Sequence, residues 1–163
     1  MGQETQGWTA EYGGVLLKGA LAGCTATGPM TLFMLAAHRF LPLHQRSSLP
    51  PKKLTMHVAQ RLGLKKHMDQ QQRDALTWAA HFGYGTGMGA LYSPLAHKVP
   101  VPGAVKGTVF GLAVWAAAYA GGLPAMTMPE AASEQPWQRN ALMISAHAVW
   151  GLTVGLVVDV LDR

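Results

Sequence analysis

Two histidines lie well inside uncharged stretches of the chain, which makes them the residues best placed to do chemistry. His81 lies in segment 75–97 and His147 in segment 140–158, and both follow the pattern Ala-His-x-x-aromatic-Gly-x-x-x-Gly. A neutral imidazole can join helices by hydrogen bonds, relay protons near neutral pH, or ligate a haem iron. Interhelical hydrogen bonding is the simplest role. Haem or pigment binding and proton relay are the alternatives, so the pair is the candidate cofactor-binding site.

The segments that hold these histidines predict a membrane protein. Charged residues make up 13% of the chain, against roughly 25% in an average soluble domain. A bilayer needs about 20 predominantly apolar residues per helix, whereas buried helices of soluble proteins are shorter and amphipathic. We therefore predict a single all-α domain over residues 1–163, an integral membrane four-helix bundle with spans at about 14–40, 75–97, 103–123 and 138–161.

Glycines spaced four residues apart occur in every predicted span. Small residues at this spacing form a flat stripe along a helix, and such stripes let helix backbones approach closely in lipid. The second span offers a further stripe, Gly85 with Gly89. The predicted helix-packing residues are Gly19, Gly23, Gly83, Gly87, Gly107, Gly111, Gly151 and Gly155.

The chain also shows a possible internal repeat. Lys18-Gly19-x-x-x-Gly23 in the first span matches Lys106-Gly107-x-x-x-Gly111 in the third, and the histidine pattern links the second span to the fourth. The sequence thus predicts two helical hairpins related by a pseudo-twofold axis along the membrane normal, as in parallel transporter repeats. His81 and His147 would then lie at equal depth and face the bundle interior.

The connection 41–74 carries most of the basic residues. Its segment 52–64 predicts a short amphipathic helix on the membrane surface, and a solvated basic loop is the alternative. By the positive-inside rule this loop is cytoplasmic and both termini lie outside. The candidate lipid-headgroup contacts are Lys52, Lys53, Arg61, Lys65 and Lys66.

The chain also contains the short motifs Gly28-Pro29-Met30-Thr31, Pro50-Pro51-Lys52, Ala80-His81 with Tyr84-Gly85, and Ala146-His147 with Trp150-Gly151. Together they resemble the YagU-like family of small bacterial inner-membrane proteins. The resemblance implies a multi-pass protein of the bacterial inner (plasma) membrane and a helical bundle. It implies no activity, because the family has none assigned.

The sequence contains no nucleophile elbow, phosphate loop, zinc-protease helix or paired catalytic carboxylates, so we do not expect an enzyme. The first functional hypothesis is a structural or accessory subunit that acts through helix packing, as a homo-oligomer or within a larger membrane complex. The second is a haem or pigment carrier that uses His81 and His147. The third is a small transporter or proton-conducting bundle. The expected partners are the bilayer and anionic lipid headgroups, and nucleic acid is not expected.

Overall fold

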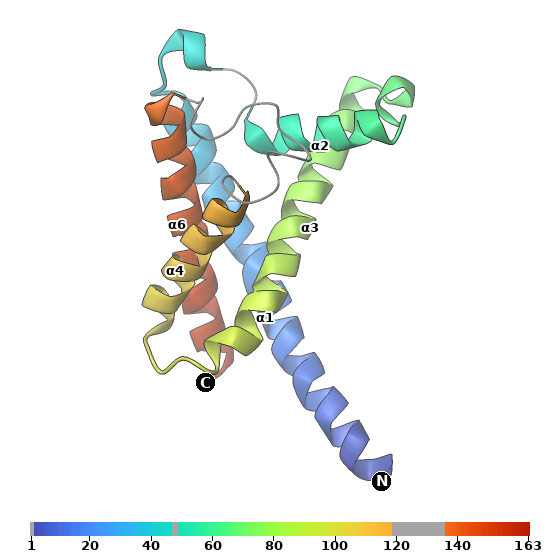
Figure 1. Ribbon diagram of the computed structural model, residues 1–163, viewed down its shortest axis with the longest axis vertical. Helices are drawn as coiled ribbons and strands as arrows, with labels where there is room; N and C mark the ends of the chain where they lie inside the picture. Colours follow the sequence, from blue (N-terminus) through green and yellow to red (C-terminus); the bar gives the residue numbers. More distant parts are fainter. Residues whose placement is uncertain (1, 47–48, 119–135) are drawn as a thin grey trace.

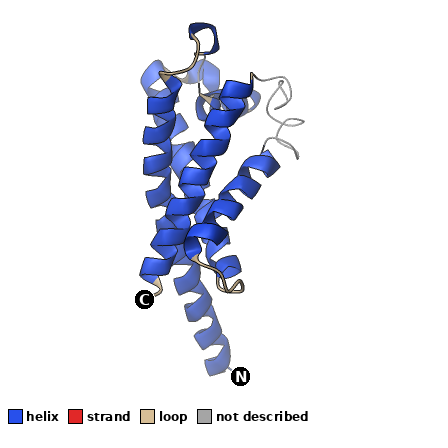
Figure 2. Ribbon diagram, turned by 90° about the vertical axis from the view of Figure 1, so that its left-hand side faces the viewer, coloured by secondary structure: helices blue, strands red, loops and turns tan. Residues whose placement is uncertain are grey.

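The computed structural model describes residues 2–46, 49–118 and 136–163, and within them helices are the regular secondary structure (Figure 1). Four long helices pack along one another, and α2 (Pro50–Arg61) runs across them. Two short 3-10 helices, η1 (Leu43–Gln45) and η2 (Lys65–His67), flank α2. The long helices are α1 (Gly2–His38), α3 (Gln70–Ala96), α4 (Gly103–Ala116) and α6 (Trp137–Leu161). The N-terminal part of α1 extends beyond the other helices in both ribbon views (Figures 1 and 2).

Local sequence signals explain where these helices begin and end. Asp69 caps α3, because its carboxylate accepts a hydrogen bond from the Gln72 backbone N–H at 2.8 Å and the Gln72 side chain bonds back to the Asp69 N–H. Pro102 and Pro136 stand directly before α4 and α6, where a missing N–H costs nothing. Just past α2, Gly63 adopts φ +70°, a left-handed conformation that glycine reaches without strain.

The predicted helical segments are mostly helical where the structure describes them, but α1 ends at His38 instead of residue 40 and α3 ends at Ala96 instead of residue 97. The surface segment predicted at 52–64 is also a helix, although it begins at Pro50 and ends at Arg61. The third span was predicted to reach residue 123. The described part of α4 ends at Ala116, and residues 119–123 lie outside the described part of the chain.

Two of the described helices are long and apolar enough to cross a membrane, Tyr12–His38 within α1 and Trp137–Leu161. Over its described length, α4 is a shorter apolar helix. The uncharged segment 75–97 of α3 contains glycines, threonines and histidines as well as apolar residues. The absence of charged residues therefore overstated how apolar α3 is. By length and composition, two of the four predicted spans are able to cross a membrane.

Glycines bring α1 and α3 into backbone contact. A Cβ atom added at Gly23 would overlap the carbonyl oxygen of Gly85 and lie 2.8 Å from the Cα of Gly89. A Cβ added at Gly19 would overlap the carbonyl oxygen of Gly89. Since backbone atoms cannot move aside as a flexible side chain can, glycine is required at this crossing.

The crossing of α4 with α6 has the same set of contacts. A Cβ added at Gly151 would meet the carbonyl oxygen of Gly107, and one added at Gly155 would meet that of Gly103. Gly85 and Gly89 make the corresponding contacts with Gly23 and Gly19. Gly19 thus corresponds to Gly103 and Gly23 to Gly107. The sequence match had paired Gly19 with Gly107, so the predicted register was wrong by one helical turn in the first helix of each pair.

One predicted packing stripe makes no contact with the described part of the chain. Gly83 and Gly87 have open space where a Cβ would stand, whereas Gly85 and Gly89 face α1. Successive residues of a helix are about 100° apart, so stripes two residues apart lie about 200° apart around the axis and cannot face the same neighbour. Gly83 and Gly87 therefore do not pack against the described helices, and their role in helix packing stays a prediction.

The two helix pairs join along α1 and α6. Ala22 and Ala26 of α1, and Ala146 and Val154 of α6, are fully buried in this seam. In contrast, α3 and α4 contact each other little. The pairs therefore meet on one side and leave space on the other.

Charged side chains gather at the two ends of the molecule. At the end near the C-terminus, Asp162 pairs with Lys18 at 2.9 Å and with His97 at 3.1 Å, which links α1, α3 and α6. At the other end, Lys52 of α2 pairs with Asp74 of α3 at 2.7 Å. The Lys52 hydrogen bond lowers the pKa of the Asp74 carboxyl below its usual value.

The predicted headgroup contacts are consequently not all equivalent. Lys52 is engaged with Asp74, and the Lys65 ammonium donates to the Gln60 side chain at 3.2 Å. Arg61 and Lys66 are exposed and Lys53 is half-buried. Their contact with lipid headgroups stays a prediction.

Candidate ligand-binding cavity

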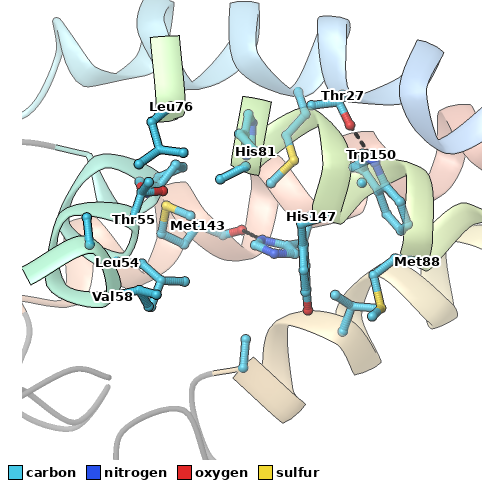
Figure 3. Close-up of a pocket in the computed structure, with 18 of the residues that line it drawn as sticks. Thr27, Leu54, Thr55, Val58, Leu76, His81, Met88, Met143, His147 and Trp150 are labelled. Atoms are coloured by element: carbon cyan, nitrogen blue, oxygen red, sulfur yellow. Dashed lines mark hydrogen bonds between the residues drawn. The ribbon is translucent and has the colours of Figure 1, made fainter. Parts of the chain in front are cut away.

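A cavity of about 410 Å³ lies between α2 and the two helix pairs, where α3 and α4 diverge. Ligand sites typically have volumes of about 300–1,000 Å³. His81 and His147 both line this cavity, as the close-up in Figure 3 shows. The two histidines thus line one cavity, while their predicted equal depth and cofactor-binding role stay predictions. Among the described lining residues, the polar side chains are Thr27, Thr55, His81, Tyr84, His147 and Trp150, and the others are apolar.

The His147 ring is held by its own helix. Its Nδ1 lies 2.8 Å from the carbonyl oxygen of Met143, one turn earlier in α6. A carbonyl oxygen can only accept, so Nδ1 carries the hydrogen. A neutral imidazole then has its lone pair on Nε2, at the far side of a ring that is 9% exposed. His147 therefore presents a hydrogen-bond acceptor to the cavity.

His81 is oriented by α1 instead. Its Nε2 lies 3.2 Å from the hydroxyl oxygen of Thr31, and that hydroxyl donates its single hydrogen to the carbonyl of Thr27 at 2.7 Å. The Thr31 oxygen therefore accepts a hydrogen bond from the His81 Nε2–H. Nδ1 of His81 is left as an acceptor. His81 also lines a smaller cavity of about 230 Å³ near Lys52 and Asp74.

Trp150 connects the two helix pairs beside the histidines. It is 3% exposed, and its indole N–H donates to the Gly23 carbonyl and the Thr27 hydroxyl oxygen, both at 3.3 Å. Its ring centroid lies 6.3 Å from that of Phe110 on α4. Tyr84 occupies the matching place in the histidine pattern but is 46% exposed. The shared pattern gave no sign of this difference.

Helix α2 supplies one wall of the cavity. Leu54, Thr55 and Val58 lie on the side of α2 that faces the histidines (Figure 3). We had predicted an apolar side for this helix but had assigned it to the membrane surface. Spacing within α2 predicts the apolar side, but only the tertiary arrangement places it over a cavity.

The part of the chain that the structure describes holds no cluster of three or more His, Cys, Asp or Glu side chains able to bind a metal ion. The two imidazoles are the strongest potential ligands in the cavity. They would suit a group that brings most of its own coordination, such as a haem, or a molecule that they hydrogen-bond.

Most of the chain matches the model of one protein family. Residues 31–156 match the model of the family described as Protein of unknown function (DUF1440). The chain belongs to this family. The matched region includes the cavity wall from α2 and both histidines but begins after Gly19 and Gly23. The chain matches no curated protein and no solved structure. The expectation of an uncharacterised family is confirmed, whereas the narrower YagU-like resemblance stays a prediction.

Proposed function

We propose that this protein is a four-span membrane protein that binds an apolar, lipid-soluble molecule in its cavity. The observation that carries the proposal is the cavity itself, which is mostly apolar and contains two imidazoles that each keep one acceptor nitrogen. Sites for small molecules combine such an apolar lining with a few polar groups that orient the ligand. His81 and His147 would hold the polar end of the bound molecule.

The outer surface of the helices supports the membrane part of the proposal. Large apolar side chains are exposed on all four long helices, while charged side chains gather at the two ends. Exposed apolar surface of this extent is unfavourable in water and ordinary in lipid. Examples are Leu17, Leu21, Leu32, Leu91, Leu95, Val105, Val109, Leu152, Leu156 and Val160.

The matching glycine contacts of the two helix pairs support the internal repeat. If the pairs are related by a pseudo-twofold axis along the membrane normal, His81 and His147 occupy equivalent places. A cavity where the pairs diverge would then bring both imidazoles to one ligand. The repeat needs the corrected register, in which Gly19 matches Gly103.

A haem or pigment is one form that the ligand could take. A histidine that ligates a metal commonly donates its other ring N–H to a carbonyl, as His147 does toward Met143. An absorption spectrum of the purified protein decides this case, because a bound haem gives a Soret band.

The structural-subunit hypothesis would rest on the open stripe at Gly83 and Gly87.

Filling the cavity should displace the ligand. Val114 lines the cavity and is 8% exposed, so Val114→Phe should place a ring in it. Val109, on the same helix, is 62% exposed, so Val109→Phe is the matched control. Both proteins would be extracted in polymer nanodiscs without detergent, and their bound molecules quantified by mass spectrometry. We expect a stoichiometric apolar molecule in the wild type and the control and its loss in Val114→Phe. Equal ligand content in all three proteins would contradict the proposal.

The proposed topology places the connections 41–74 and 97–102 on opposite sides of the membrane. Cys24, the single cysteine, lies within α1, so Cys24→Ser provides a cysteine-free background. Single cysteines at the exposed positions Lys66 and Lys98 would be tested with a membrane-impermeant maleimide. We expect Lys98→Cys to react in intact spheroplasts and Lys66→Cys only in inverted vesicles. Reaction of both from one side would show that the number of spans between them is wrong.

A further inference from the structure

We infer that the cavity selects an uncharged apolar molecule whose polar end donates a hydrogen bond, such as an alcohol, a phenol or a quinol, over the matching ether or ketone. The inference rests on the proposed function and specifies the ligand of the same cavity. It follows from an account of every polar hydrogen in the described lining.

Apart from the Tyr84 hydroxyl, the side-chain polar hydrogens of the described lining are already used within the protein. The Thr27 hydroxyl donates to the Gly23 carbonyl at 2.8 Å, and the Thr55 hydroxyl donates to the Pro51 carbonyl at 2.8 Å. The Trp150 N–H is directed at the Gly23 carbonyl and the Thr27 oxygen. Each of these donors is committed to an acceptor inside the helix bundle.

The ring N–H groups of the two histidines are also committed to acceptors within the protein. His147 uses its N–H on the carbonyl of Met143, and His81 uses its N–H on the oxygen of Thr31. Each neutral ring keeps one lone pair that can accept a hydrogen bond, and among the described lining residues Tyr84 has a hydroxyl that can both donate and accept. A ligand that can only accept would leave these imidazole nitrogens unpaired in an apolar site, which is costly. A ligand that donates satisfies them.

The charge of the ligand follows from the same lining. An ammonium group would also donate, but the described residues of the cavity lining include no carboxylate to neutralise it. Burying an unpaired charge costs far more than burying a hydroxyl. The ligand is therefore a neutral donor with an apolar body.

Three probes of equal chain length test the selection. They are brominated hexadecanol, its methyl ether and the corresponding ketone, each titrated into the full chain in lipid nanodiscs. Binding is followed as saturable quenching of tryptophan fluorescence by bromine, and Val114→Phe gives the non-specific baseline. We expect the alcohol to bind about tenfold more tightly than either analogue, the effect of one satisfied hydrogen bond.

Variants identify the acceptor. His147→Leu and His81→Leu should each reduce the advantage of the alcohol and leave the affinity for the ether within about twofold, because only a hydrogen bond is lost. His67→Leu, at an exposed position outside the cavity, should retain the full preference. The comparison of probes on the wild type needs no variant, so a variant that fails to fold does not weaken it.

The outcomes separate the two proposals. Equal binding of the three probes, or tighter binding of the ketone, would overturn the inference about donors and leave the cavity as a ligand site. Absence of saturable binding for all three probes would overturn the proposed function. Preference for the alcohol that persists in both His147→Leu and His81→Leu would assign the selection to another group and overturn the role given to the histidines.

Discussion

Replacing Trp150 with alanine should destabilise the protein by about 3–5 kcal/mol, the usual cost of removing a buried aromatic ring. Trp150 is 3% exposed and contacts both helix pairs, through hydrogen bonds to α1 and through ring contact with Phe110 of α4. Its loss would leave an empty volume at the junction of the pairs and extend the cavity. The free energy of unfolding can be measured in mixed micelles by far-UV circular dichroism.

Two further variants make this expectation specific. Tyr84→Ala changes the corresponding aromatic residue of the other histidine pattern, but Tyr84 is about half exposed, so we expect a loss of about 1 kcal/mol or less. Trp150→Phe keeps an aromatic ring and removes the indole N–H, for an expected loss of about 1 kcal/mol. Similar losses for Trp150→Ala and Tyr84→Ala would mean that the helix pairs are not joined through Trp150.

The second large effect concerns the crossing of α1 and α3. We expect Gly23→Ala to destabilise the protein by about 1–3 kcal/mol, because the added methyl group overlaps backbone atoms that can move only if the helices separate. The measurement is the same unfolding experiment.

A matched glycine on α3 should respond with the opposite sign. Gly87 has open space around a built Cβ, so Gly87→Ala meets no neighbour and should stabilise the helix by about 0.5–1 kcal/mol. If Gly87→Ala were as damaging as Gly23→Ala, the exposed stripe of α3 would have to contact another protein or a second copy of this chain. That result would favour the structural-subunit hypothesis.

The helices were the part of this fold most accessible from the sequence. The segment predicted at 138–161 is observed as the helix Trp137–Leu161, and the helix predicted at 52–64 begins two residues earlier, at Pro50. Helix bonds are local, so uncharged runs, prolines and caps are enough to locate a helix. Whether each helix crosses a membrane depends on how apolar it is, and the uncharged run of α3 was a poor guide to that.

The candidate site was predictable only in part. The shared pattern around His81 and His147 singled out both histidines, and the structure brings them to one cavity. The sequence could not choose between the stripes Gly83–Gly87 and Gly85–Gly89, because both have the spacing that packing requires. The backbone contacts in the structure show that Gly85 and Gly89 face α1. The same contacts show that the predicted match between the first helices of the two pairs was off by one helical turn.

Residue types and their spacing alone determined that the described part of the chain is helical, where most of its helices begin and end, and which two imidazoles could share a site. The tertiary structure decided which ring nitrogen of each histidine can still accept a hydrogen bond. Met143 and Thr31 take one nitrogen of each ring. The tertiary structure also decided that α2 forms one wall of a cavity, and that Trp150 is buried while Tyr84 is half exposed. The physical reason is that helix formation depends on neighbours along the chain, whereas burial and hydrogen-bond partners depend on residues far away in the sequence.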